Sequence, residues 1–166
     1  HARIVAEKLQ KAGVRKIITT DPHTTYALKV LYPKYVGASF EVSTYFEALH
    51  LRESGAGNKI TLHDPCFYGR YLELSNAPRR ILGEIGFECV DVRESGLFTS
   101  CCGGPAESIS PKLSSRIGSK RVQKLDATGQ QIVTMCPICL NNLARSGANV
   151  VDLSSILAGD EASATN

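Results

Sequence analysis

Residues 131–145 read QIVTMCPICLNNLAR, and they predict a short strand that leads directly into a helix. The strand, Gln131–Met135, contains adjacent β-branched residues. The helix, Pro137–Arg145, begins with proline, which is favoured at a first helical position. Cys136-Pro137-Ile138-Cys139 therefore occupies a strand-to-helix junction. Free amide groups and the helix dipole at such a junction lower a thiol pKa, and the thiolate is the form that binds metal.

Strands and helices alternate along the rest of the chain. Further strands are predicted at Lys16–Thr20, Lys59–His63, Glu88–Val92 and Asn149–Asp152, and further helices at Ala2–Ala12, Pro22–Leu31, Pro78–Glu84 and Pro111–Leu125. Residues 94–105 are predicted to form a loop. This alternation is typical of an α/β fold in which βα units build largely parallel sheets. Residues at the carboxyl ends of parallel strands meet at one edge of a sheet, so we expect the cysteines there to act as ligands.

The chain contains a degenerate internal repeat. Residues 3–24 and 116–139 each read as a helix, a glycine, a strand and then X-Pro-X-X at the start of a second helix. A second apolar strand and a short helix follow each copy, at 42–49 and 150–157. The fold is therefore predicted to consist of tandem-derived βα units.

The repeat predicts a division of the chain into parts. We interpret residues 1–52 as the back half of a degenerate first repeat and residues 59–159 as an intact second repeat. Residues 160–166 are small and polar, and we expect a disordered tail. The chain begins at His1 without a methionine, so we expect it to be cut from a longer protein.

Composition and charge exclude several classes of protein. No apolar run approaches the roughly 18 residues needed to span a bilayer, and no secretory signal opens the chain. A net charge of +3, with basic residues spread through helices and no interleaved aromatics, argues against nucleic-acid binding. We therefore expect a cytoplasmic protein, or one associated with a membrane through partner subunits.

Five of the six cysteines fall into three groups. They are Cys66, Cys101, Cys102, Cys136 and Cys139. The gaps between the groups are 34 and 33 residues, so each group follows its own βα segment. Two glycines follow Cys102 and allow the backbone to turn tightly beside a bulky group. Cys89 lies inside a predicted strand and outside this pattern, and we interpret it as a core thiol.

The number of thiols favours one kind of site over its alternatives. A disulfide framework is typical of short secreted chains without a core, which does not fit this sequence. Five thiols are one more than a tetrahedral zinc takes, so they favour a polynuclear iron-sulfur cluster. Two alternatives stay open: a structural zinc scaffold on four of the thiols, and a metal-free dithiol oxidoreductase that uses Cys136 and Cys139.

The cysteine pattern resembles the CCG cysteine-rich domain of heterodisulfide reductase catalytic subunits of the B/D type. The motifs that carry the resemblance are Asp64-Pro65-Cys66, Pro78-Arg79, Cys101-Cys102-Gly103-Gly104-Pro105 and Cys136-Pro137-Ile138-Cys139. The resemblance covers residues 59 to about 157 and extends to iron-sulfur subunits of glycolate, lactate and glycerol-phosphate oxidising systems.

The resemblance implies a cofactor, an activity and partners. It implies that the five grouped cysteines hold a non-cubane four-iron, four-sulfur cluster, with zinc as the alternative metal. It also implies an oxidoreductase subunit that moves electrons to or from a disulfide, a thiol or a quinone-linked partner. Ferredoxin-like or flavoprotein subunits of a redox complex would be its partners.

The first repeat departs from the family pattern. Asp21-Pro22-His23-Thr24 stands where a tandem family member would have Cys-Pro-X-Cys. Aspartate is a good N-cap and proline a good first helical residue, so the helix start is retained while the ligands are lost. We therefore expect one cluster, and we favour a capping role for Asp21 over metal binding by Asp21 and His23.

Three further features are weighed as functional candidates. His63, before the Cys66 loop, is a candidate to hydrogen-bond a cluster sulfur or to carry a proton, although a structural histidine is equally consistent. Arg70 is a candidate to bind an anionic group or is solvated. A basic side of the helix at 111–125 is interpreted as a solvent face, or else a docking site for an acidic ferredoxin-like partner. It comprises Lys112, Arg116, Lys120, Arg121 and Lys124.

Overall fold

The computed structural model describes residues 1–50 and 57–159 and divides the chain into two compact units, His1–His50 and Leu51–Asn166. Both units are α/β with parallel strands, which confirms the predicted fold class. Residues 51–52 of the predicted first repeat and the predicted tail at 160–166 lie outside the described residues. No helix in the described part of the chain is long and apolar enough to cross a membrane.

The second unit is built on a four-stranded parallel sheet in the order β4-β3-β5-β6. The strands are β3 (Lys59–His63), β4 (Glu88–Cys89), β5 (Gln131–Thr134) and β6 (Val150–Asp152). The two central strands are buried on both faces over most of their length. Continuous burial of this kind is expected of parallel strands that helices cover on both sides.

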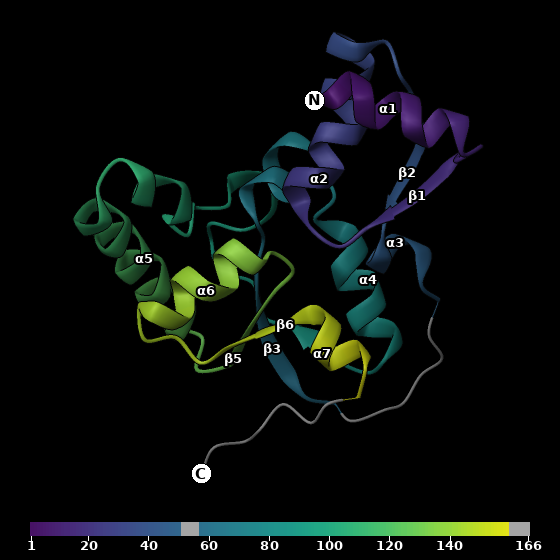
Figure 1. Ribbon diagram of the computed structural model, residues 1–166. Coiled ribbons are helices and arrows are strands. Elements are labelled where there is room, and N and C mark those ends of the chain that lie inside the picture. The colour runs from purple at the N-terminus through teal and green to yellow at the C-terminus, as the bar shows by residue number, and fades with distance from the viewer. Residues whose placement is uncertain (51–56, 160–166) are drawn as a thin grey trace. The chain divides into compact units, whose positions relative to one another are not determined.

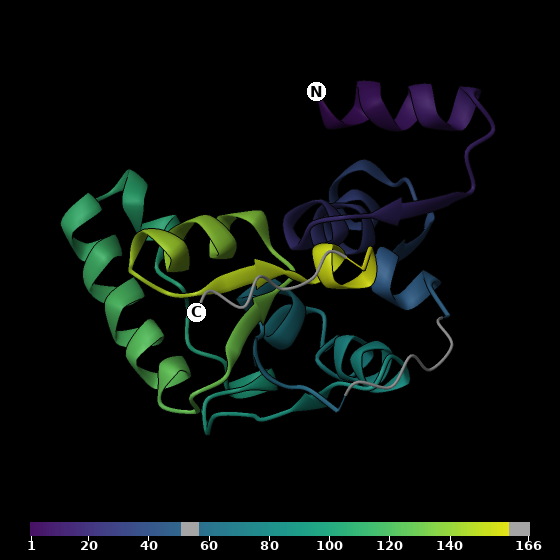
Figure 2. The same ribbon diagram turned by 90° about the horizontal axis from the view of Figure 1, so that it is seen from below.

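Helices connect the strands of the second unit. They are η2 (Phe67–Tyr71), α4 (Asn76–Glu84), η3 (Gly96–Phe98), η4 (Gly104–Ser108), α5 (Pro111–Asp126), α6 (Pro137–Arg145) and α7 (Leu153–Leu157). Helix α5 packs beside α6, and the views in Figures 1 and 2 both show this arrangement. A cluster of Val122, Leu125, Ile132 and Leu143 forms the core under these helices, and three of the cysteines are buried in it.

The first unit has a two-stranded parallel sheet, β1 (Lys16–Thr19) and β2 (Glu41–Thr44), and three α-helices. The α-helices are α1 (Ala2–Lys11), α2 (Pro22–Tyr26) and α3 (Tyr45–Ala48), with the π-helix η1 (Ala27–Val36) after α2. The order α1-β1-α2-β2-α3 matches α5-β5-α6-β6-α7 in the second unit. The descent of the two units from a repeat stays a prediction.

Three predicted boundaries were wrong. The helix expected to stop at Leu31 continues to Val36 as η1, and its wider π-helical turns accommodate Pro33, which has no N–H. Strand β4 ends at Cys89 because the Val90 carbonyl accepts a hydrogen bond from Thr61 Oγ1, at 3.1 Å. The predicted loop at 94–105 contains the 3₁₀ helix η3 and the start of η4.

The start of α2 confirms the capping role expected of Asp21. Its carboxylate accepts hydrogen bonds from the amides of His23 and Thr24, both at 2.9 Å. Burial raises the pKa of this carboxyl, but the hydrogen bonds from Thr24 and His23 outweigh burial and leave the pKa lowered. The cap therefore contributes stability above the ordinary pKa of 3.8, and this contribution is lost as pH falls through the lowered folded value.

We predict that Asp21→Ala lowers the free energy of unfolding by about 0.5–2 kcal/mol at neutral pH, because two amides at the start of α2 lose their acceptor. Urea unfolding measures the loss, which should shrink at a pH below the carboxyl pKa. The matched control, His23→Ala, should cost less because it keeps the backbone amide that Asp21 caps and removes only the ring, whose Nδ1 lies 3.8 Å from the Asp21 carboxylate. Iron per chain should not change in either variant; a proportional loss of iron would contradict the capping assignment.

Candidate metal centre

The five grouped cysteines form one continuous row of sulfur atoms in the second unit. Neighbouring thiols interact with one another in the order Cys66, Cys101, Cys102, Cys139 and Cys136. The row is open at one end, because Cys66 and Cys101 are half-buried while the other three are buried. The structure thus brings together all five candidate ligands, and Cys89 lies outside the row.

Strand pairing places the two ends of the row. Strands β3 and β5 are parallel neighbours, and His63 pairs with Thr134 at their carboxyl ends. Cys66 follows β3 and Cys136 follows β5, so both leave the same edge of the sheet. Cys136 is the N-cap of α6, and Cys139 lies in the first turn of that helix.

The Cys-Cys-Gly-Gly segment turns its own amides toward its thiols. The amide of Gly103 donates to Cys101 Sγ at 3.3 Å, and that of Gly104 donates to Cys102 Sγ at 3.4 Å. Gly103 has φ +91°, and a Cβ there would lie 2.6 Å from the Ser114 carbonyl oxygen. Glycine is therefore required at this position. Asn142 Nδ2, on α6, donates to the Cys102 carbonyl at 2.5 Å and ties this segment to the CxxC helix.

An ion pair between partly exposed Arg79 and the buried carboxylate of Asp64 fixes the loop that carries Cys66. Both oxygens of Asp64 accept from Arg79 of α4, at 2.8 and 2.9 Å, and one also accepts from the amide of Gly96 at 2.7 Å. The Asp64 carbonyl accepts from Thr99 Oγ1 at 2.7 Å. Gly69 permits this closeness, because a Cβ there would lie 2.5 Å from the Gly96 carbonyl oxygen. One residue thus joins the Cys66 loop, α4 and the segment before Cys101.

Arg121 was predicted to lie on a basic solvent face, and this prediction is wrong. The side chain is 1% exposed, whereas Lys112, Arg116 and Lys120 of the same helix are exposed. The buried positions of α5 are Ser114, Gly118, Arg121, Val122 and Leu125. Spacings of three and four residues put Arg121 on the core face, and this periodicity was the sequence signal that could have identified it.

Arg121 and His63 form a buried pair beneath the thiol row. Arg121 Nε donates to His63 Nδ1 at 3.1 Å. A ring nitrogen of His63 and the sulfurs of Cys102 and Cys139 lie within 4.8 Å of one another. Burial, followed by the charge of Arg121, lowers the pKa of His63 to about 3, so the imidazole is neutral. The predicted catalytic role of His63 stays a prediction, and its place beside the row is now defined.

The thiols shift one another's pKa along the row. Hydrogen bonds from Cys102 and Cys66 lower the pKa of Cys101 despite burial, and the Gly103 amide adds to the effect. Cys66, Cys102 and Cys139 donate within the row, so their pKa values are raised. In the metal-free row Cys101 is therefore the favoured thiolate, and the full set of thiolates requires a bound cation.

Arg70 lies at the open end of the row. Its side chain is exposed and within hydrogen-bonding distance of Cys66, and its charge opposes the rise in the pKa of that thiol. An exposed guanidinium beside a half-buried thiol can hold an anionic group there. Binding by Arg70 remains a prediction. Cys89 is half-buried, and burial raises its pKa to about 11; its interpretation as a core thiol stays a prediction.

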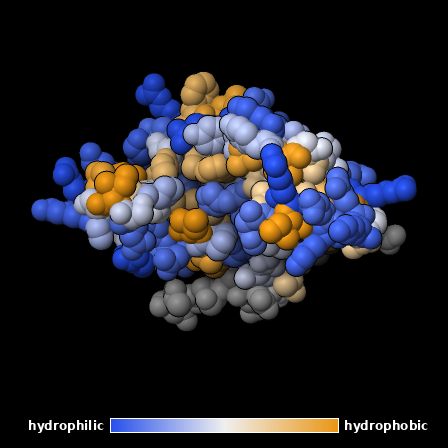
Figure 3. Space-filling model, turned by 45° about the horizontal axis from the view of Figure 1, so that its top comes forward, coloured by the Kyte–Doolittle hydropathy of each residue, from blue (hydrophilic) through white to orange (hydrophobic). Residues whose placement is uncertain are grey.

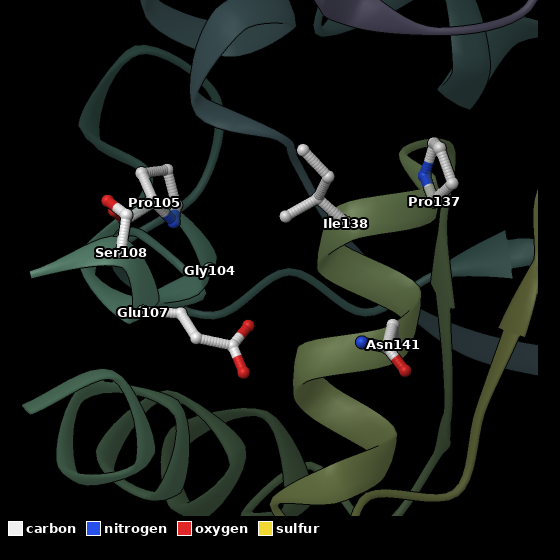
Figure 4. A pocket seen from close by; sticks show the side chains of 7 residues that line it. All are labelled: Gly104, Pro105, Glu107, Ser108, Pro137, Ile138 and Asn141. Carbon is white, nitrogen blue, oxygen red and sulfur yellow. The ribbon is translucent and has the colours of Figure 1, made fainter. Parts of the chain in front are cut away.

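A cavity of about 550 Å³ lies next to the row without containing it. It lies between η4 and α6. Figure 4 shows that Pro105, Glu107 and Ser108 line one side of it and that Ile138 and Asn141 line the other. None of the grouped cysteines lines it. The candidate chemistry therefore belongs to the row of thiols, and the cavity lies on its flank.

The segment that carries the thiol row matches a known protein family. A family model for the CCG cysteine-rich domain matches residues 60–144, about half of the chain and all five grouped cysteines. The chain belongs to the CCG cysteine-rich domain family. The CCG match lies within the second unit, where Cys66, Cys101 and Cys102 meet Cys136 and Cys139. No solved structure matches the chain.

Three curated relatives extend the similarity beyond the CCG match. The "Probable membrane-anchored ferredoxin" of Chromohalobacter salexigens is 34% identical over 83% of this chain and 23% of the relative. A polypeptide of the dihydromethanophenazine:CoB–CoM heterodisulfide reductase of Methanosarcina barkeri is 31% identical over 86% and 38%. EtfAB:quinone oxidoreductase of Syntrophomonas wolfei is 33% identical over 83% and 22%. The chain thus spans less than two fifths of these relatives.

We predict that Arg79→Met lowers the free energy of unfolding by about 3–5 kcal/mol, because it leaves the buried carboxylate of Asp64 without its cation. Urea unfolding measures the loss. The neighbouring Arg80 forms an exposed pair with Glu84, so Arg80→Met is the control and should cost no more than about 0.5 kcal/mol. Equal losses in the two variants would contradict a locking role for Asp64 and Arg79.

Proposed function

We propose that this CCG domain holds one iron-sulfur cluster on Cys66, Cys101, Cys102, Cys136 and Cys139, and that it carries electrons within a larger redox complex. The observation that supports this most is the continuous row of five thiols. When bound, the cluster would supply reversible one-electron chemistry. A four-iron, non-cubane type is the form we expect from the family resemblance.

The donor set fits an anionic iron-sulfur cluster. Thiolates are the usual ligands of such clusters, and amides that donate to the sulfurs, as those of Gly103 and Gly104 do, stabilise their charge. Buried Arg121 supplies a positive charge within electrostatic range of Cys102 and Cys139. A structural zinc site would use four thiols and leave one unused, so we place it second.

Electrons would enter and leave at the open end of the row. Cys66 and Cys101 are half-buried, whereas Cys102, Cys136 and Cys139 are sealed in the core. A partner or a thiol substrate can therefore approach only the first two. Arg70 is exposed beside Cys66 and would hold an anionic part of that partner.

The partners would be other parts of a redox assembly. The relatives are named as a ferredoxin, a heterodisulfide reductase component and a quinone oxidoreductase, each much longer than this chain. Ferredoxin-like or flavoprotein subunits fit this set, and the terminal acceptor would be a disulfide or a quinone-linked partner. Such subunits could also associate the chain with a membrane.

Exposed hydrophobic side chains near the row fit a docked partner. Phe98 is 81% exposed and Ile109 is 83% exposed, and they flank the segment that carries Cys101 and Cys102. On the face shown in Figure 3, hydrophobic residues form separate clusters among hydrophilic ones. Interfaces are built from such clusters within a polar rim.

One cluster is proposed for this chain, because the carboxylate of Asp21 is engaged in capping α2. Disulfide cleavage by paired clusters would then need a second cluster from another part of the assembly. Electron transfer through one cluster is accordingly the activity that we assign to this chain alone.

Anaerobic purification followed by analysis of iron, zinc and acid-labile sulfide tests the proposal. We expect iron and sulfide in equal, cluster-level amounts per chain, with a visible absorption that bleaches on reduction. Stoichiometric zinc without iron or sulfide would replace the proposal with the structural zinc scaffold. Electron paramagnetic resonance and Mössbauer spectra of the two redox states would identify the cluster type.

We predict that serine at any one of the five grouped cysteines removes or converts the cluster, because an alkoxide replaces thiolate poorly as an iron ligand. Iron and sulfide per chain, with the visible spectrum, measure the effect. Cys89→Ser is the matched control and should keep the wild-type values. If Cys89→Ser bleaches the absorption as fully as Cys102→Ser does, the ligand assignment is wrong.

A further inference from the structure

Beneath the thiol row lies a group of buried nitrogen atoms without partners. His63 is 0% exposed and Arg121 is 1% exposed. His63 Nε2 and Arg121 Nη1 and Nη2 have no hydrogen-bond partner among the residues that the structure describes. A buried polar group left unpaired costs about 1–3 kcal/mol, and more when it is charged. This arrangement therefore needs an explanation beyond packing.

All three nitrogens are donors. His63 Nδ1 accepts from Arg121 Nε, so the neutral imidazole carries its proton on Nε2. The guanidinium of Arg121 stays protonated and has no acceptor capacity. The group thus presents N–H donors and one positive charge, and what it lacks is a negatively charged acceptor.

The carboxylates in electrostatic range of Arg121 are already engaged. Asp64 accepts from Arg79 and Gly96, and Glu94 pairs with Lys124. Burial lowers the pKa of Arg121, while Asp64, Glu94, Cys139 and Cys102 oppose that shift. The sulfurs of Cys102 and Cys139 lie within 4.8 Å of a ring nitrogen of His63 and can accept as thiolates.

The burial of these atoms decides between two kinds of acceptor. A substrate anion would have to reach nitrogens that solvent does not reach. A cofactor bound on the thiols would instead bring its negative charge to the sulfurs already in place. A cofactor on the thiols would therefore supply the negative charge that these donors lack.

We propose that Arg121, oriented by His63, is the buried counter-charge that sets the reduction potential of the cluster, an inference that rests on the proposed function. Reduction adds one negative charge to the cluster, and a nearby buried cation stabilises that charge with little screening by solvent. Arg121 thus raises the potential. His63 is a positioning residue, because its Nδ1 accepts a hydrogen bond from Arg121 Nε and so fixes the orientation of the guanidinium.

Redox titration of the anaerobically loaded full chain tests this inference, with iron and sulfide per chain measured first. In Arg121→Met we expect at least a tenfold lower ratio of reduced to oxidised cluster at the wild-type midpoint, equal to about 59 mV in the negative direction for a one-electron couple. Arg121→Lys should restore most of the shift because it keeps the charge. The matched control, Arg116→Met, removes an exposed cation from the same helix and should not move the potential.

The His63 variants test the positioning role. His63→Leu should shift the potential in the same direction as Arg121→Met, since Arg121 then loses the acceptor that orients it. His63→Gln should restore most of the shift, because its amide offers both an acceptor and a donor. A purely structural role of His63 would alter stability and leave the potential of the loaded protein unchanged.

Each outcome decides the inference. Wild-type protein without iron overturns the proposed function and this inference together, whereas loaded Arg121→Met with an unchanged potential overturns the inference alone. If circular dichroism shows that Arg121→Met does not fold, the double variant Arg121→Met, His63→Leu replaces it in the titration. The double variant removes the donor and its acceptor together, so neither is left unpaired. If Arg121→Lys binds iron and sulfide and the methionine variants do not, this result supports the role of Arg121 as the counter-charge. Loss of iron or of folding in every Arg121 variant overturns it.

Discussion

The parallel pairing of β3 with β5 is the constraint on which the rest of the second unit depends. Because His63 pairs with Thr134, both strands end at the same edge of the sheet. Cys66 and Cys136 follow within a few residues of these two strand ends. A shift of one residue would exchange the side chains that each strand buries under the helices on the two faces of the sheet, and would disrupt the packing on both. The positions of Cys66 and Cys136 are therefore fixed by the hydrophobic core before any metal binds.

The second group of cysteines, Cys101 and Cys102, does not directly follow a strand and is held by polar contacts. The segment before Cys101 is joined to the Cys66 loop by Asp64, through the amide of Gly96 and the hydroxyl of Thr99. The segment after Cys102 is held by Asn142 from α6. Each contact runs between parts of the site that are far apart in sequence. The thiol row is thus preorganised by hydrogen bonds that are shielded from water, where they are strongest.

Sequence reasoning identified the parts of this site that local rules control. Gln131–Thr134 and Pro137–Arg145 lie almost where they were predicted, because a β-branched strand and a proline helix start are local signals. The end of β4 and the helices η3 and η4 escaped prediction, since they depend on contacts such as Thr61 with Val90 that join distant segments. Arg121 was misassigned for a different reason: its charge was given more weight than its place in the helical period.

Arg121, the residue that was misassigned, explains how the buried thiol groups can carry negative charge. A metal-free row favours one thiolate, Cys101, because each neighbouring thiol keeps its proton as a donor. Metal binding would release those protons and add negative charge inside the core, which is costly unless a cation is already present. Arg121 carries the opposite cost, because it is a buried cation without a hydrogen-bonded anion among the described residues. The cost of burying the thiolates and the cost of burying the guanidinium offset one another only when both groups are charged at the same time. The unpaired arginine and the surplus of thiols therefore belong to a single electrostatic arrangement.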